Sequence, residues 1–102
     1  SPVQVKVLTI AERHKDYADI VFNLLKGEGI RVEIDFDNEK IGYKIRNATI
    51  MKVPYLIIIG DKEVSENKIT VRKRTGENEG PLSISEFTEK LKNKIKQKEI
   101  DL

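Results

Sequence analysis

The chain has 102 residues, of which 38% are hydrophobic and 35% are charged, so residues 1–102 can form one domain around one core but not two domains. It has no cysteine and a single histidine, His14, which excludes disulfides, cysteine-based zinc sites and thiol nucleophiles. No apolar run approaches the roughly 18 residues of a membrane helix. With no signal peptide either, we expect a soluble protein of the cytoplasm or, alternatively, of an organelle. The start at Ser1, without an initiator methionine, favours a domain cut from a longer chain.

The first third of the chain predicts a strand, a helix and a second strand. Residues 3–10 are rich in valine and isoleucine, which favours a strand. Residues 14–28 predict an amphipathic helix, because their apolar side chains recur at helical spacing, at Tyr17, Ile20, Val21, Leu24 and Leu25. Residues 30–36 alternate strictly between apolar and polar side chains, as in a half-exposed strand near a sheet edge, and Phe36 is expected in the core.

The middle of the chain predicts a second helix and a buried strand. Asp37 or Asn38 can cap this helix. The helix is expected to reach about Met51, before Pro54 ends it, with an apolar stripe at Ile41, Ile45 and Ala48. Residues 55–59 form a continuous apolar run, which is expected of a central strand that is covered on both faces.

The last third predicts a short turn, a strand, a loop and a final helix. Residues 61–66 suit a turn or a single helical turn, and residues 68–74 suit a strand that points Ile69 and Val71 inwards. The run T-G-E-N-E-G-P at residues 75–81 predicts a loop. Ser83 and Glu86 form a capping box that begins a helix with apolar residues at Ile84, Phe87, Leu91 and Ile95.

This order of elements predicts an α/β fold. Strand and helix alternate in the first two-thirds, which favours parallel strands joined by right-handed crossovers. The strand at 68–74 follows its predecessor too closely for a helical crossover, so we expect it to be antiparallel. The predicted architecture is a mixed sheet of four or five strands with helices on both faces.

Basic residues gather in two segments, although the formal net charge is only +2. Residues 40–52 and residues 68–74 each hold four basic side chains and no acidic one, whereas acidic side chains gather at Glu33, Asp35, Asp37 and Glu39. Two basic segments on a nearly neutral protein can form a phosphate-binding face. A solvated surface with chance clustering is the alternative that charge alone leaves open.

Motifs for catalysis are absent from the sequence. No glycine-rich dinucleotide or phosphate-loop signature follows a strand. The carboxylates of residues 33–37 alternate on an exposed strand, where solvated surface charge explains them better than acid–base chemistry. A metal site or a catalytic triad would need His14, and nothing near it favours either. We expect no catalytic site, metal or cofactor in this domain.

Several polar residues suit the recognition of a nucleic acid instead. The Asn38 amide can cap a helix or pair with a base edge, and a lone carboxylate at Glu63 suits an edge rich in N–H donors, such as that of guanine. Arg72 can fork onto base acceptors or a phosphate. Arg46 and Lys52 suit backbone phosphates. Further candidates for stacking or backbone contact are Tyr43, Lys44 and Arg74.

Three runs of residues carry a resemblance to a known family. They are N-E-K-I-G-Y-K-I-R at residues 38–46, V-P-Y-L-I-I-I-G-D-K-E-V at residues 53–64 and V-R-K-R at residues 71–74. Together they resemble the C-terminal anticodon-binding domains of class II aminoacyl-tRNA synthetases, most of all the threonyl enzymes. The resemblance covers essentially the whole chain, and it implies a three-layer α/β/α domain with a five-stranded mixed sheet and three main helices.

The resemblance also implies a function. Such a domain of a threonine–tRNA ligase binds the anticodon loop and reads the second and third bases, guanine and uracil, and the family positions for bases match Asn38, Glu63 and Arg72. Arg46 and Lys52 match basic positions around the loop, although Lys52 is an arginine in some relatives. The parent enzyme would use ATP, magnesium and a zinc ion in its catalytic domain. It would be a homodimer, whereas the isolated domain is expected to be a monomer that contacts no membrane.

Two other functions stay open at this point. A protein-interaction module without tRNA recognition would share the fold and would self-associate or bind a protein partner. A small α/β enzyme could use His14 or the carboxylates, but the sequence favours it least.

Overall fold

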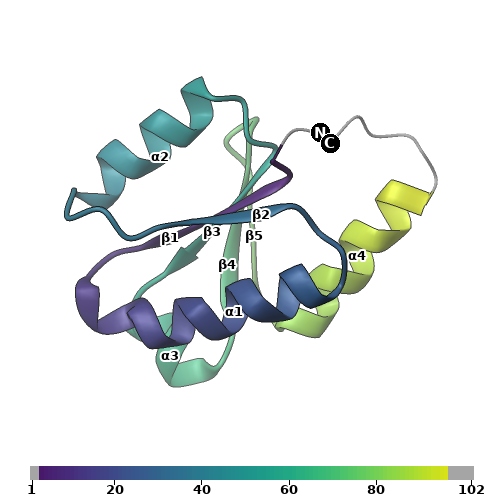
Figure 1. Ribbon diagram of the computed structural model, residues 1–102, viewed down its shortest axis with the longest axis horizontal. Helices are drawn as coiled ribbons and strands as arrows, with labels where there is room; N and C mark the ends of the chain where they lie inside the picture. The colour runs from purple at the N-terminus through teal and green to yellow at the C-terminus, as the bar shows by residue number, and fades with distance from the viewer. Residues whose placement is uncertain (1–2, 97–102) are drawn as a thin grey trace.

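Strand and helix alternate as the sequence predicts, and the computed structural model describes residues 3–96 (Figure 1). The elements in chain order are β1 (Val5–Thr9), the 3-10 turn η1 (Glu12–His14), α1 (Lys15–Gly27), β2 (Val32–Asp35), α2 (Ile41–Ile50), β3 (Tyr55–Ile59), α3 (Asp61–Glu66), β4 (Ile69–Lys73), β5 (Asn78–Leu82) and α4 (Ile84–Lys96). They form a five-stranded sheet in the order β2-β1-β3-β4-β5. The pairs β1–β2 and β1–β3 are parallel, and β3–β4 and β4–β5 are antiparallel. The predicted mixed sheet is therefore confirmed.

Apolar side chains leave the two faces of the sheet and pack against different helices. Helices α1 and α4 cover one face, where a large cluster includes Val21, Ile57 and Phe87. Helix α2 covers part of the other face through a small cluster of Leu8, Ala48, Val53 and Leu56. Figure 1 shows α2 on one side of the sheet and α1 and α4 on the other. The three main helices of the predicted three-layer fold are confirmed, and α3 adds a short fourth one.

The apolar stripe of α1 differs from the prediction. Ile20 and Leu24 were expected in the core, but they are 55% and 50% exposed, whereas Ala18 is fully buried. The Tyr17 hydroxyl donates a hydrogen bond to the carbonyl oxygen of Lys68 at 2.8 Å. The buried side of α1 is formed by Ala18, Val21 and Leu25, and the small side chain of Ala18 lets the helix lie close to the sheet.

The connection between β2 and α2 also differs. Phe36 was predicted in the core, but it follows the end of β2 and is 41% exposed. Its ring centroid lies 5.1 Å from Nζ of Lys15. The predicted caps Asp37 and Asn38 lie in a loop, and the N-cap of α2 is Lys40. The cause is a turn after β2, in which the backbone N–H of residue 37 donates to the Asp35 side chain at 2.8 Å.

The predicted loop at residues 75–81 contains the start of an edge strand. Strand β5 pairs with β4 across an irregularity between Ile69 and Val71. Gly80 has a φ of +117°, and a Cβ there would lie 3.1 Å from the Ile69 carbonyl oxygen. An edge strand with a bulge tolerates glycine and proline, which is why these residues misled the prediction.

The start of α4 confirms the predicted capping box. The Ser83 hydroxyl accepts a hydrogen bond from the Glu86 N–H at 3.1 Å, and the Glu86 carboxylate accepts one from the Ser83 N–H at 2.9 Å. Hydrogen bonding from the Ser83 N–H, and secondarily from the Ser83 side chain, lowers the pKa of the Glu86 carboxyl. The predicted core position Ile95 lies outside the side chains that the structure describes. Within residues 3–96, no helix has the length and apolar character needed to cross a membrane.

Candidate nucleic-acid interface

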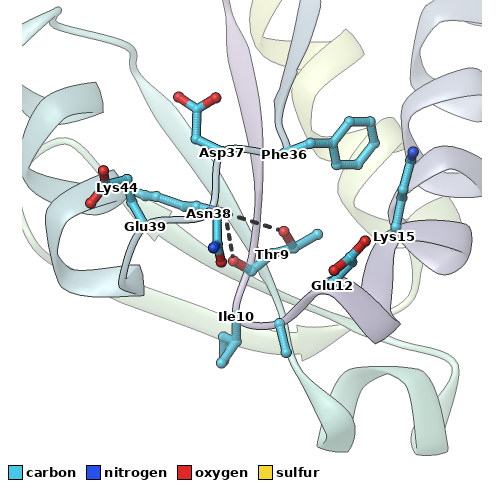
Figure 2. A pocket seen from close by; sticks show the side chains of 10 residues that line it. Thr9, Ile10, Glu12, Lys15, Phe36, Asp37, Asn38, Glu39 and Lys44 are labelled. Atoms are coloured by element: carbon cyan, nitrogen blue, oxygen red, sulfur yellow. Dashed lines mark hydrogen bonds between the residues drawn. The ribbon is translucent and has the colours of Figure 1, made fainter.

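Asn38 lines a cavity at the carboxyl ends of β1 and β2. The cavity has a volume of about 230 Å³ and is lined by Thr9, Ile10, Ala11, Glu12, Lys15, Phe36, Asp37, Asn38, Glu39 and Lys44. Figure 2 shows the side chains of Lys15 and Phe36 on one side of it, while the carboxylate of Asp37 points away from Thr9. Asn38 itself is exposed in the loop before α2, so its amide is available to a ligand.

Lys44 lies in the interior beneath this loop. Its side chain is only 3% exposed. Its Nζ donates hydrogen bonds to the carbonyl oxygen and the hydroxyl of Thr9, at 3.0 and 3.3 Å, and to the carbonyl oxygen of Asp35 at 3.4 Å. Dashed lines in Figure 2 mark the two bonds to Thr9. This buried position does not suit the backbone contact that the sequence suggested for Lys44, because the ammonium group already serves acceptors inside the protein.

Glu63 lies in the first turn of α3 with its carboxylate held by two hydrogen bonds. One oxygen accepts the N–H of Gly60 at 2.8 Å, and the other accepts the hydroxyl of Thr70 at 2.8 Å. The residue is half-buried. Each carboxylate oxygen can accept a further hydrogen bond, so the group is both oriented and able to accept from a ligand. Burial, and secondarily the charge of Glu63, raises the pKa of Tyr17.

Arg72 lies on β4 on the same face of the sheet as α2. It pairs in register with Leu56, which belongs to the small cluster under α2. Thr70 is two residues before Arg72, so the alternation of the strand points both side chains to this face. Arg72 is half-buried. Glu63, Thr70 and Arg72 therefore follow one another along the face that α2 leaves partly open.

Ile10 links the cavity of Asn38 to Glu63. The Ile10 side chain lines that cavity. It also lies against Gly60, where an added Cβ would come within 2.6 Å of Cδ1 of Ile10. Gly60 in turn donates to Glu63. The structure thus places Asn38 and Glu63 at the same end of the sheet, where the parallel strands have their carboxyl ends. Arg72 lies further along β4. We call Asn38, Glu63, Thr70 and Arg72 the polar row.

The remaining candidates lie along and beyond α2. Arg46 and Tyr43 are exposed on α2, with Tyr43 57% exposed. Lys52 is exposed just after α2, with a φ of +62°. Arg74 is exposed after β4, and its N–H donates to the Pro54 carbonyl oxygen at 3.0 Å. Lys52 and Arg74 therefore lie towards the start of β3, at the opposite end of the sheet from Asn38.

Sequence reasoning missed Thr70 as a partner of Glu63. The signal was available, because the alternation of residues 68–74 places Thr70 on the same side as Arg72. The hydrogen bond itself depends on the Glu63 side chain of α3 reaching β4, a tertiary contact that the sequence pattern does not predict. The polar row thus contains one residue that the list of candidates lacked.

Comparison with known proteins bears on this site. A family model described as "Anticodon binding domain" matches residues 4–94. The chain belongs to the anticodon binding domain family. This domain is 60% identical over 95 residues to the threonine–tRNA ligase of Clostridium tetani, a match that covers 93% of the chain. It is 53% identical over 98 residues, or 96% of the chain, to that of Clostridium botulinum strain Hall. The chain spans 15% of the length of each of these two relatives.

Solved structures agree with this assignment. The RNA binding domain of threonyl-tRNA synthetase from Cryptosporidium parvum superposes with a TM-score of 0.86 at 32% identity, covering 91% of this domain and 24% of that chain. Histidyl-tRNA synthetase from Nostoc sp. PCC 7120 has the same fold, with a TM-score of 0.84 at 21% identity over 93% of this domain and 23% of that chain. The family resemblance and the fold class predicted from the sequence are confirmed.

The histidine of this anticodon binding domain has a structural place. His14 is buried, and its Nδ1 accepts the N–H of Ala11 at 3.0 Å while its Nε2 lies 2.5 Å from Oδ1 of Asp61. Arg13 donates two hydrogen bonds to Asp61, at 2.9 and 2.7 Å. Arg13 first, and then His14, hold the pKa of Asp61 well below its usual range. These contacts tie η1 to α3. No group of three or more potential metal ligands gathers within residues 3–96.

Proposed function

We propose that this domain binds the anticodon loop of threonine tRNA as part of a threonine–tRNA ligase. In this proposal Asn38, Glu63 and Arg72 read the second and third anticodon bases, guanine and uracil, and thereby support aminoacylation by the catalytic domain of the same enzyme. The 60% identity to the ligase of Clostridium tetani supports the choice of threonine among the family's amino acids.

The observation that carries the proposal is the arrangement of opposite hydrogen-bonding groups on one face. The Glu63 carboxylate only accepts hydrogen bonds, and the Arg72 guanidinium only donates them. Glu63 is oriented by Gly60 and Thr70, and Arg72 lies along the same open face. Unpaired bases of an RNA loop present both donors and acceptors on their Watson–Crick edges. A carboxylate suits the N–H donors of guanine, and the arginine fork suits carbonyl acceptors.

The exposed cations of α2 and its C-terminal end suit the RNA backbone. Arg46 is exposed on α2, and Lys52 and Arg74 are exposed towards the start of β3. Such residues hold phosphates and fix the register of the loop without reading its sequence. The exposed ring of Tyr43 is a candidate for stacking.

The rest of the proposed enzyme would supply the chemistry. A threonine–tRNA ligase uses ATP and magnesium, and we propose that these, together with a zinc ion, bind in a catalytic domain outside this chain. We further propose that the parent enzyme works in the cytoplasm as a homodimer and that the isolated domain is a monomer. Sedimentation of the 102-residue chain checks the last point, since a stable dimer would contradict it.

Fluorescence anisotropy with labelled anticodon stem-loops tests the proposed function. One stem-loop carries the threonine anticodon, and two others differ from it only in the second or the third anticodon base. All three are measured at the same stated salt concentration, because phosphate contacts make affinity depend steeply on salt. The expected result is a preference of about tenfold or more for the threonine loop over each altered loop.

The opposite result would remove the proposal. Equal affinity for all three loops, falling steeply with salt, would mean that only a phosphate-binding surface is present. A protein partner in place of RNA would then be the better function. Repeating the titration with Arg46→Ala separates phosphate contacts from base contacts, because loss of a phosphate contact weakens the binding of all three loops alike.

A further inference from the structure

We propose that Lys44 is the positioning residue of the loop that carries Asn38, and that it sets base discrimination through that loop. The inference rests on the proposed function, because it gives Lys44 a part in reading a base. Lys44 does not touch the ligand in this proposal. It acts from beneath the loop, through the two strand ends that its ammonium group holds.

The Lys44 ammonium group lies in an unusual environment for a charged group. The side chain is 3% exposed, and its three hydrogen-bond acceptors are two carbonyl oxygens and one hydroxyl. No ion pair of Lys44 occurs in the described part of the chain. Burying a charge without an opposite charge costs free energy, and an apolar side chain would fill the same space without that cost. The ammonium group must therefore contribute something that an apolar side chain cannot.

Lys44 connects the end of β2 to helix α2. Its Nζ bonds to the carbonyl oxygen of Asp35, the last residue of β2. Its backbone N–H donates to the carbonyl oxygen of Lys40, the N-cap of α2, at 3.2 Å. The latter bond is the first i→i−4 bond of α2, which any residue at this position makes. The side chain of Lys44 therefore ties Asp35, just before the loop 36–40, to α2, just after it. The bonds from Nζ to Thr9 fix the same point to the end of β1.

Asn38 lies in the part of that loop for which Lys44 matters most. The turn after β2, in which Asp35 accepts the N–H of Asp37, fixes only the first part of the loop. Asn38 follows, exposed and lining the cavity that Lys44 also lines. Without the ammonium group, Asp35 would lose its link to α2, and the amide of Asn38 would sample more positions. A contact that depends on the position of a base edge would weaken, whereas phosphate contacts of Arg46 on the exposed side of α2 would not.

The first experiment examines the loop without RNA. Lys44→Met keeps the apolar stem of the side chain and removes its hydrogen-bond donors. Thr88→Val is the control, because it removes a buried hydroxyl on the other face of the sheet. That hydroxyl donates to the carbonyl oxygen of Ile84 within α4, at 2.7 Å. In NMR spectra, Lys44→Met is expected to move the amide signals of residues 35–40 and to speed their hydrogen exchange. Thr88→Val should leave them in place. Unchanged signals of residues 35–40 in a folded Lys44→Met protein would overturn the proposal.

The second experiment asks whether Lys44 acts through Asn38. Lys44→Met, Asn38→Ala and the double variant are titrated with the threonine stem-loop and the two altered loops. Each single variant is expected to reduce the preference for the threonine loop, Asn38→Ala by about tenfold, and the double variant should lose no more than Asn38→Ala alone. Affinity for the loop altered at the base that Asn38 reads should stay within about twofold. Additive losses of preference, or an equal loss on all loops, would overturn the proposal, because a merely structural role predicts one of these.

A chemical rescue makes the test specific for the ammonium group. The chain has no cysteine, so Lys44→Cys can be alkylated in the unfolded state to a lysine analogue with a sulfur in the stem and then refolded. The analogue should restore the loop signals and the preference, and failure to restore them would count against the ammonium group. If the unmodified domain shows no preference among loops, the proposed function fails, while the NMR comparison still decides whether Lys44 holds the loop.

Discussion

The two faces of the sheet differ in how fully apolar side chains cover them. The face under α1 and α4 is closed by a large apolar cluster, in which side chains such as Phe87 and Ile57 are almost fully buried. The face under α2 has a small apolar cluster, and beyond it Thr70 and Arg72 remain half-buried and polar. Most of the apolar burial that stabilises the fold thus lies on one face, whereas the candidate contacts to RNA lie on the other. Substitutions should therefore separate stability from recognition.

The largest expected effect comes from the closed face. Phe87 is 2% exposed and packs edge to face on Tyr55, with ring centroids 5.8 Å apart. Phe87→Ala should lower the free energy of unfolding by about 3–5 kcal/mol, because it leaves a cavity between α4 and the sheet. Urea denaturation followed by circular dichroism measures this. A loss below about 1 kcal/mol would mean that the site collapses or that this face does not carry the stability.

The next effect should appear in binding and not in stability. Arg72→Ala should weaken binding of the threonine stem-loop by about 1–3 kcal/mol and change the free energy of unfolding by about 0.5 kcal/mol or less. Lys73→Ala is the matched control, because Lys73 is the next residue of β4 and points to the opposite face. Its contact with Glu79, at 3.1 Å, lies away from the polar row. Equal losses of affinity in the two variants would show that charge matters and position does not.

A smaller effect should come from Thr70. Thr70→Val removes the hydroxyl that donates to Glu63 at 2.8 Å. The expected loss of stability is about 1 kcal/mol, and the preference for the threonine loop should fall because the carboxylate is less well oriented. Thr70→Ser keeps a hydroxyl and should retain the preference. If serine and valine behave alike in the anisotropy titration, Glu63 does not depend on this hydrogen bond.

The closed face was the easier one to predict from sequence. Strand alternation, helical periodicity and the capping box of Ser83 and Glu86 are local patterns, and the structure confirms them. The inward position of Ala18 escaped prediction, because it depends on how α1 packs on the sheet and on segments distant in sequence, such as Lys68, which accepts a hydrogen bond from Tyr17. Local patterns therefore predict which segments form elements better than they predict how each element is turned.

The open face was harder because its polar side chains are placed by tertiary contacts. Lysine is usually exposed, and nothing local marks Lys44 as the residue that would reach Thr9 and Asp35. The same turn after β2 moved Phe36 out of the core and Asn38 out of the helix cap. The roles of Asn38, Glu63 and Arg72 in reading bases stay predictions, which the titrations above address.

The smallest expected effect concerns the contact between η1 and α3, which lies at the carboxyl ends of the parallel strands. Asp61 accepts hydrogen bonds from Arg13 and contacts His14, and both hold its pKa below the usual value of 3.8. A carboxylate whose pKa is lower in the folded than in the unfolded state contributes its full stabilisation above the unfolded pKa. This stabilisation is lost progressively as the pH falls from the unfolded pKa through the folded pKa. Asp61→Asn should therefore be less stable than the unmodified domain near pH 6, and the difference should shrink as the pH falls below about 4.

The magnitude should be small because Asp61 is exposed, and solvent weakens its ion pair with Arg13. Urea midpoints measured from pH 6 to pH 2 give the difference directly. Asp16→Asn is the control, since Asp16 is an exposed carboxylate at the start of α1 that forms no ion pair within residues 3–96. A difference that does not depend on pH would mean that Asp61 acts by packing alone. If Asp61→Asn keeps the preference for the threonine stem-loop, this contact serves stability and not RNA recognition, although it lies at the same end of the sheet as Asn38.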